Sequence, residues 1–193
     1  MPLDSGAMPL PLPALLGIAY GLSEAGLGWL KRSRDDSVDA DDRSLRTLWV
    51  TILLSVAAGV LASYQLPQAT FGGVATQWIG CVAFGLGLAL RWYSIVYLGR
   101  YFTVNIAIHS SHEVIDTGPY RRIRHPSYAG ALLAFAGLGL TIGNWVSLAL
   151  VVLPIFWAFG RRMRLEERAL ANALGTPYTR YMWRTKRLLP FVY

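Results

Sequence analysis

The fold class is decided by the stretch Val74–Leu98, VATQWIGCVAFGLGLALRWYSIVYL, which contains one charged residue, Arg91. An α-helix needs about 20 predominantly apolar residues to cross the hydrocarbon core of a bilayer, and this run supplies them. In the whole chain 54% of the residues are hydrophobic and 15% are charged, well below the roughly 25% charged share of a soluble domain. The sequence therefore predicts an all-α integral membrane protein with a single domain over residues 1–193.

Four further apolar runs flank this stretch, so we expect about five transmembrane helices. The last two runs are short and meet at Gly143-Asn144, a turn signal that predicts a tight helical hairpin. The first run has no Lys or Arg before it, which favours a first membrane helix over a secretory signal. Three helices would thus lie in residues 1–98, and residues 99–193 would hold the hairpin and a C-terminal segment. The four flanking runs are Pro9–Leu30, Leu45–Leu66, Ser127–Gly143 and Trp145–Gly160.

Lys and Arg alternate between loops, and this alternation predicts the orientation. They cluster in residues 31–46, 100–124 and 161–187, whereas the two intervening loops have none. Because cytoplasmic loops carry the excess of positive residues, we expect the N-terminus outside and the C-terminus in the cytosol. The net charge of +7 then reflects topology and contact with anionic lipid headgroups. With no recognition motif present, no nucleic-acid partner is expected.

Ionisable residues inside the spans need a partner or a cavity. Glu24 lies in the first predicted helix and Arg91 in the third. Arg91 could snorkel to the membrane edge, pair with Glu24, or face a substrate cavity. The Asp-rich loop at residues 35–42 has no regular metal-ligand spacing, so it is interpreted as a solvated linker, and no metal site is expected.

The segment His112–Gly130, HEVIDTGPYRRIRHPSYAG, gathers polar and cationic groups at the membrane edge. Pro126 suits the first turn of a helix, where its missing N–H is no loss. The free N–H groups of that helix start, with nearby cations, favour binding of an anionic group such as a carboxylate. Asp116-Thr117-Gly118-Pro119 predicts a turn that folds the loop back on itself.

A second polar segment follows the last apolar run. Residues 161–175, RRMRLEERALANALG, predict a helix leaving the membrane, with Gly175 as its stop. Arg162 and Glu166 lie four residues apart on one face, either as a surface ion pair or as part of a site opposite the first polar segment. Tyr178, Tyr181 and Trp183 are interpreted first as interfacial anchors and second as pocket walls.

The order of motifs in the C-terminal half, Leu98 to Pro190, resembles isoprenylcysteine carboxyl methyltransferases of the prokaryotic type. The motifs are Leu98-Gly99, His112 to Ile115, Gly118, Tyr120, RHPSYAG from Arg124 to Gly130, Glu166-Glu167, and Gly175-x-x-Tyr178-x-x-Tyr181. Phospholipid N-methyltransferases and certain sterol reductases share parts of this arrangement. No GxGxxG stretch opens a helix after a strand.

The resemblance implies a membrane methyltransferase that uses S-adenosylmethionine, yields S-adenosylhomocysteine and has its catalytic half in residues 99–193. It implies that Arg162 contacts the substrate. From the residues themselves we expect catalytic roles for Arg162 and Glu167 and a substrate contact for Arg91. Asn105 is a candidate for one further polar contact of the family. The implied cofactor-binding residues are His112, Glu113, Val114, Ile115, Tyr120, Arg124, His125, Pro126, Ser127, Tyr128 and Glu166.

The chemistry of methyl transfer does not decide whether the acceptor is a carboxylate or an amine. A carboxylate is already ionised at neutral pH, so Arg162 would only need to hold it for in-line attack. An amine acceptor would need a base, for which Glu166 or Glu167 is the candidate. An NADPH-dependent reductase or a non-catalytic scaffold is the remaining alternative. We expect the cofactor to arrive from the cytosol and a lipophilic substrate to arrive from the bilayer, while small-residue spacing leaves the oligomeric state open.

Overall fold

The computed structural model describes residues 12–31, 39–102 and 113–190, which form six α-helices and short 3-10 turns. Within these ranges the only β-type pairings are isolated bridges, Thr70 with Asn144 and Ile123 with Lys186. The all-α prediction is therefore confirmed. The α-helices are α1 (Leu12–Lys31), α2 (Asp39–Gln65), α3 (Val74–Leu98), α4 (Pro126–Ile142), α5 (Trp145–Leu174) and α6 (Thr176–Arg184).

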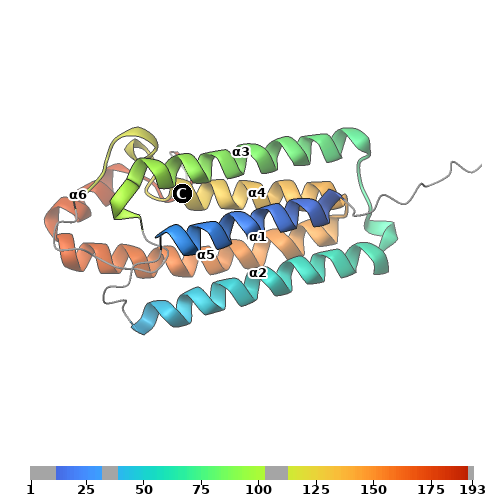
Figure 1. Ribbon diagram of the computed structural model, residues 1–193, viewed down its shortest axis with the longest axis horizontal. Helices are drawn as coiled ribbons and strands as arrows, with labels where there is room; N and C mark the ends of the chain where they lie inside the picture. Colours follow the sequence, from blue (N-terminus) through green and yellow to red (C-terminus); the bar gives the residue numbers. More distant parts are fainter. Residues whose placement is uncertain (1–11, 32–38, 103–112, 191–193) are drawn as a thin grey trace, which may run out of the picture.

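Helices α1 to α5 run side by side as an elongated bundle, and α6 lies at one end of it (Figure 1). Three stretches of the described residues are long and apolar enough to cross a membrane: Arg43–Gln65, Val74–Tyr101 and Trp145–Leu174. α4 is a shorter apolar helix. Large apolar side chains such as Leu53 and Leu54 point outward, at 67% and 65% exposure. These outward faces suit a lipid environment.

α5 differs from the expected arrangement, because it continues through Gly160 to Leu174 as one helix. From the sequence, the apolar run ended at Gly160 and was too short for a full span, and a helix leaving the membrane was expected from Arg161. Residues 161–174 are mostly strong helix formers, so nothing interrupts the helix before Gly175. Gly175 has φ +61° and donates its N–H to the Ala171 carbonyl at 2.9 Å, confirming the predicted stop. The apolar segment and the charged segment after it therefore form one continuous helix.

The predicted turn between α4 and α5 is confirmed at Gly143-Asn144. Gly143 adopts φ +69°, a left-handed conformation that glycine reaches without steric cost. The Asn144 side chain accepts from the Ser147 N–H at 3.1 Å and donates to the Leu66 carbonyl at 2.8 Å. One buried amide therefore caps α5 and fastens the far end of α2 to the hairpin.

Small residues bring α3 and α4 into close contact. A side-chain carbon added to Gly130 would lie 2.6 Å from the backbone nitrogen of Arg91 and from the Gly87 carbonyl oxygen. Gly80 and Gly137 meet in the same way further along the pair. The small-residue spacing therefore serves internal packing, and it sets the position of Arg91 against the start of α4.

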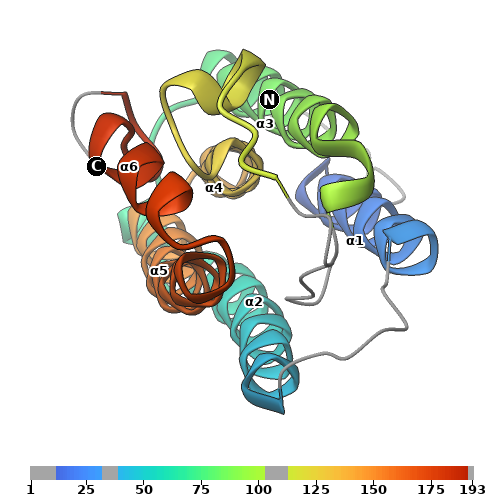
Figure 2. The ribbon, with the colours of Figure 1, turned by 90° about the vertical axis from the view of Figure 1, so that its left-hand side faces the viewer.

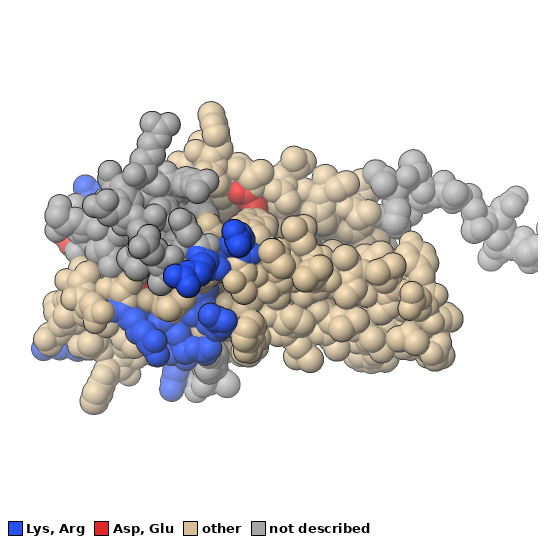
Figure 3. All heavy atoms as spheres, turned by 90° about the horizontal axis from the view of Figure 1, so that it is seen from below, with Lys and Arg blue, Asp and Glu red and all other residues tan. Residues whose placement is uncertain are grey.

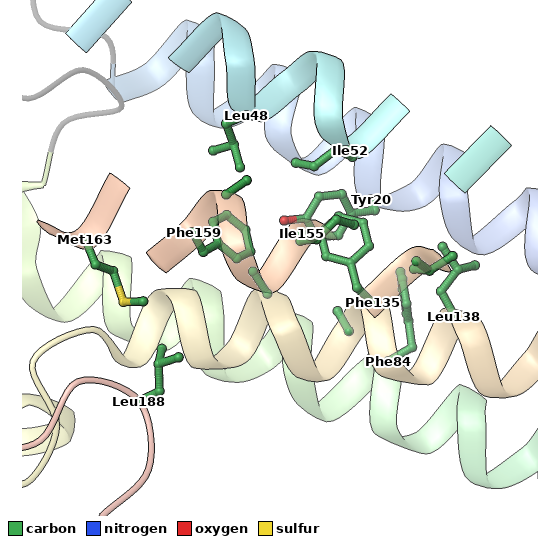
Figure 4. Packing of buried hydrophobic residues seen from close by; sticks show 14 residues of the cluster. Tyr20, Leu48, Ile52, Phe84, Phe135, Leu138, Ile155, Phe159, Met163 and Leu188 are labelled. Atoms are coloured by element: carbon green, nitrogen blue, oxygen red, sulfur yellow. The ribbon is translucent and has the colours of Figure 1, made fainter. Parts of the chain in front are cut away.

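α4 lies among α1, α3 and α5, while α2 packs on the outer side of α5 (Figure 2). The buried apolar side chains between these helices interleave along the bundle (Figure 4). Tyr20 of α1 packs its ring 4.6 Å from that of Phe135 of α4, centroid to centroid. Of the helices, α1 has its main contact with α4, so α4 links the N-terminal helix to the rest of the bundle.

Candidate active site

A large cavity lies at the end of the bundle that carries α6, and Figure 2 looks onto this end. One half is polar and built by the start of α4, the charged part of α5, α6 and the segment before α4. The other half is mainly apolar and built by α1, α2 and α5. Of the residues expected from the sequence, the cavity is lined by Arg91, Glu113, Val114, Ile115, Tyr120, Arg124, His125, Ser127, Tyr128, Arg162 and Glu166.

The start of α4 is held in place by the C-terminal segment. Pro126 occupies the first turn as predicted. The backbone N–H of Arg124 donates to the Lys186 carbonyl at 2.7 Å, and that of His125 donates to the Arg187 carbonyl at 3.0 Å. This pairing turns His125, Ser127 and Tyr128 toward the cavity, whereas Pro126 is fully buried and does not line it. Pro126 thus shapes the site from behind.

The Tyr128 hydroxyl joins Arg162 to Glu166. Nε of Arg162 donates to the Tyr128 oxygen at 3.1 Å, and the Tyr128 hydroxyl donates to Oε2 of Glu166 at 3.2 Å. Arg162 is only 3% exposed, which excludes a surface ion pair. The expected meeting of the two polar segments is therefore observed, and it places a buried cation beside a carboxylate in the cavity wall.

Glu167 points away from the cavity and binds three basic side chains. Its Oε1 accepts from Nε of Arg124 at 2.9 Å and lies 3.3 Å from Nε2 of His125, and its Oε2 accepts from Nη2 of Arg187 at 2.7 Å. Glu167 is 3% exposed and does not line the cavity. Glu167 was predicted to be catalytic; here its carboxylate links α5 to the segment before α4 and to the C-terminal segment.

Arg124 strengthens the same connection. Besides Glu167, its Nη1 donates to the carbonyl oxygens of Met182 at 2.9 Å and Thr185 at 2.5 Å. Arg124 lines the cavity, as a cofactor-binding residue should, yet several of its donors are used to hold the end of α6. The guanidinium therefore connects the pocket wall to the C-terminal segment.

Three tyrosines brace the polar half. The Tyr181 hydroxyl donates to the Tyr120 carbonyl at 2.7 Å, and the Tyr120 hydroxyl donates to the Ser94 carbonyl at 3.1 Å. Burial raises the pKa of Tyr120, Tyr178 and Tyr181 above the usual value for a phenol, and the Glu166 carboxylate raises the pKa of Tyr120 and Tyr178 further. All three therefore stay neutral. Tyr178 and Tyr181 line the cavity, whereas Trp183 is 91% exposed, as an interfacial anchor would be.

Arg91 faces inward and pairs with Glu24. Nε and Nη2 of Arg91 donate to the two carboxylate oxygens of Glu24 at 2.5 and 2.7 Å. Both side chains line the cavity, and Nη1 lies 3.4 Å from the Ser127 carbonyl. Of the alternatives left open by the sequence, pairing and a position in the cavity are both observed, and snorkelling is not.

The apolar wall of the cavity was not predicted from the sequence. Leu45, Leu48, Trp49 and Ile52 of α2 line it, at i, i+3, i+4 and i+7 spacing. That spacing marks one helix face, which was the available signal. α5 contributes Phe159, Leu170 and Leu174, and α1 contributes Tyr20, one turn before Glu24.

His112 and Asn105 lie outside the described residues, so their expected cofactor contacts stay predictions. In the described part of the chain no group of His, Cys, Asp and Glu is placed to hold a metal ion.

Comparison with known proteins shows which proteins this chain resembles. A sequence model of the isoprenylcysteine carboxyl methyltransferase (ICMT) family matches residues 78–172. A probable protein-S-isoprenylcysteine O-methyltransferase from Oryza sativa subsp. indica is 32% identical over 118 residues, 60% of this chain and 62% of the relative. Protein-S-isoprenylcysteine O-methyltransferase A from Arabidopsis thaliana is 29% identical over 138 residues, 68% of this chain and 70% of the relative.

A solved structure of the eukaryotic intramembrane Ras methyltransferase ICMT resembles this fold with a TM-score of 0.62 and 25% sequence identity. The match covers 74% of this chain and 52% of that chain. This chain therefore spans 62% of the length of the rice relative and about half of the solved protein. The family match at residues 78–172 includes Arg91, Tyr128, Arg162 and Glu166, which meet in the cavity. Over residues 78–172 the chain is therefore similar to the isoprenylcysteine carboxyl methyltransferase family.

Proposed function

We propose that this chain transfers a methyl group from S-adenosylmethionine to the carboxylate of a lipophilic, isoprenylcysteine-like acceptor at the cytosolic face of the membrane. The observation that carries the proposal is the buried Arg162, oriented by Tyr128, in the same cavity as the apolar face of α2. A cation binds the carboxylate of such an acceptor, and an apolar wall binds its tail. Similarity to the isoprenylcysteine carboxyl methyltransferase family over residues 78–172 supports the same chemistry.

The polar half of the cavity fits the methyl donor. Its Glu113 and Glu166 carboxylates suit an ammonium group and ribose hydroxyls, and neutral Tyr120 and Tyr178 suit an aromatic base. When bound, S-adenosylmethionine supplies a methyl group activated on a sulfonium. We assign its binding to Glu113, Val114, Ile115, Tyr120, Arg124, His125, Ser127, Tyr128 and Glu166, with His112 as a further predicted contact and Pro126 shaping the wall.

Arg162 binds and orients the acceptor. A carboxylate nucleophile needs no base, so the protein contributes alignment in a site shielded from water. Tyr128 fixes the guanidinium of Arg162 before the acceptor arrives, and Glu166 in turn fixes the Tyr128 hydroxyl. Glu167 acts as a positioning residue, because its ion pairs hold the start of α4 on which Tyr128 stands.

The distribution of Lys and Arg on the surface supports the membrane orientation predicted from the sequence. In Figure 3 the visible Lys and Arg side chains gather toward the α6 end of the molecule, and the opposite part of that face shows none. By the positive-inside rule this end faces the cytosol, so the cofactor reaches it from water. The acceptor reaches the cavity from the bilayer, where α1 and α2 supply lining residues.

Cysteine labelling tests the orientation. In a Cys81→Ser background, Arg180→Cys and Gln68→Cys place single thiols at exposed positions near opposite ends of the bundle. In intact cells a membrane-impermeant maleimide should label Gln68→Cys and should label Arg180→Cys only after permeabilisation. The reverse pattern would invert the topology.

The activity is tested with purified protein in detergent. Calorimetry should detect S-adenosylhomocysteine binding to the wild type, and Glu166→Gln and His125→Ala should lose it. Radiolabelled methyl transfer to N-acetyl-S-farnesylcysteine should give a product that releases labelled methanol in alkali, as a methyl ester does. An alkali-stable product from a lipid amine would instead assign N-methylation with Glu166 as base. Binding of NADPH in place of S-adenosylhomocysteine would reject both.

A further inference from the structure

The outer face of α5 changes from apolar to basic at Arg161. Residues 145–160 of this helix contain no charged side chain, and Trp157 points outward at 54% exposure. Arg161, Arg164 and Arg168 follow on the same face, because positions three or four apart on a helix are neighbours. All three are exposed. The outward apolar surface of α5 therefore ends in a row of arginines, Arg161, Arg164 and Arg168, which we call the arginine row.

The carboxylates in this part of α5 do not neutralise the arginine row. Glu166 faces the cavity, and Glu167 is buried in its own ion pairs. Among the described residues, no carboxylate forms an ion pair with the arginine row. Like charges three or four residues apart on a helix repel one another and destabilise it. The arginine row is therefore complementary to an anion from outside the chain.

Two of the guanidiniums lie back toward the apolar part of the helix. The central guanidinium carbon of Arg161 is 5.5 Å from the centroid of the Trp157 ring. Nη1 of Arg164 is 3.7 Å from the point that a Cβ on Gly160 would occupy, so this side chain lies along Gly160. Helical side chains lean toward the N-terminus of their helix, which accounts for both directions. Since Trp rings favour the level of the lipid headgroups, the two cations lie at that level as well.

We infer that this face of α5 binds an anionic phospholipid. Arg161 and Arg164 donate to the phosphate oxygens, whose geometry matches the planar fork of a guanidinium. The acyl chains lie along the outward apolar side chains of the same helix, such as Leu153, which is 64% exposed, and Trp157. A soluble phosphate would use only the basic half of this surface. A phospholipid uses both halves, which favours the lipid as the occupant.

The lipid site and the cavity lie on opposite faces of the same turn. Arg162 stands between the outward Arg161 and Arg164 in the sequence, yet it is 3% exposed and lines the cavity. A headgroup bound to the outer face holds this turn at the membrane surface. In the proposed function, the bound lipid therefore sets the level at which Arg162 meets a membrane-borne acceptor. The binding itself does not depend on methyl transfer.

Lipid binding to the purified full chain in a nonionic detergent tests the inference. Native mass spectrometry measures the affinities for dioleoylphosphatidylglycerol and dioleoylphosphatidylcholine, which share acyl chains and a phosphate and differ in net charge. We expect the wild type to prefer the anionic lipid by about tenfold or more, the size expected for hydrogen bonds between charged groups. In Arg161→Gln/Arg164→Gln the ratio of the two affinities should fall close to one.

Arg121→Gln/Arg122→Gln is the matched control, because it removes the same number of charges from exposed positions before α4. It should keep the wild-type preference. The preference is a ratio within one preparation, so partial loss of folded protein does not alter it. An equal loss in both double variants would mean that total charge alone attracts the lipid and would overturn the inference.

Two further results would also overturn it. One is a wild type without preference for the anionic lipid, or a preference that survives in Arg161→Gln/Arg164→Gln. The other is displacement of the bound lipid by inorganic phosphate at constant ionic strength, which would assign the arginine row to a soluble anion.

Discussion

Nε of Arg162 lies 3.1 Å from the hydroxyl oxygen of Tyr128, although 34 residues separate the two in the sequence. Tyr128 stands on the first turn of α4, and Arg162 stands where α5 passes from apolar to charged sequence. Their contact unites the two polar segments of the chain. It also brings the guanidinium of Arg162 against the phenolic oxygen of Tyr128 in the cavity wall.

Tyr128→Phe should lower kcat for methyl transfer by about tenfold to a hundredfold, because Arg162 loses a hydrogen bond to a charged group. The ring contact with Phe159, 5.0 Å between centroids, is kept, so the fold should remain. Steady-state kinetics and calorimetry with S-adenosylhomocysteine measure the two effects separately. An unchanged kcat would show that the Tyr128 hydroxyl does not orient Arg162.

Substitutions at the adjacent residues Glu166 and Glu167 should have different effects, one on cofactor binding and the other on stability. Glu166→Gln should abolish S-adenosylhomocysteine binding with little effect on thermal unfolding, because Glu166 lines the cavity and, within the described residues, accepts one hydrogen bond, from Tyr128. Glu167→Gln should lower the unfolding midpoint by about 5 °C or more, since it leaves buried Arg124 without its counter-charge. Equal effects of the two variants on binding and stability would contradict this division of roles.

The different roles of Glu166 and Glu167 also show which features of the structure could be predicted from the sequence. The pattern predicted α3 to the residue and identified both polar segments, because apolar runs and helix stops are local signals. It could not decide which of two adjacent carboxylates enters the cavity, since that depends on the rotation of α5 against α4. The α2 wall was missed for a related reason: Leu48 and Ile52 look like any other lipid-facing or core positions until packing assigns their face.

Gly87→Leu should destabilise the α3–α4 contact strongly. A Cβ at Gly87 would lie 2.5 Å from the Gly130 carbonyl oxygen, so the helices would have to separate. We expect the unfolding midpoint in detergent to fall by about 5 °C or more. Gly85→Leu is the matched control, because Gly85 is exposed and a Cβ there meets nothing within 4 Å. Similar midpoints for the two variants would rule out close packing as the role of Gly87.

Stability should decrease above about pH 10 because of Tyr120, Tyr178 and Tyr181. Burial raises the pKa of each phenol in the folded state, whereas the same phenols in the unfolded chain ionise near pH 10. Their contribution is therefore complete below that pH and decreases above it, as the unfolded state releases protons that the folded state keeps. Absorbance at 295 nm should show that some of the 10 tyrosines ionise only on unfolding. Complete ionisation in the folded protein would contradict this.

The Glu24–Arg91 pair should show strong coupling in stability. Glu24→Leu alone leaves a buried guanidinium without its carboxylate, and Arg91→Met alone leaves a buried carboxylate, so each should cost about 3–5 kcal/mol. The double variant removes both charges and should cost less than either single change, because the apolar pair needs no partner. Unfolding of all four proteins in one detergent measures the cycle. Additive effects would mean that the two charges do not stabilise one another.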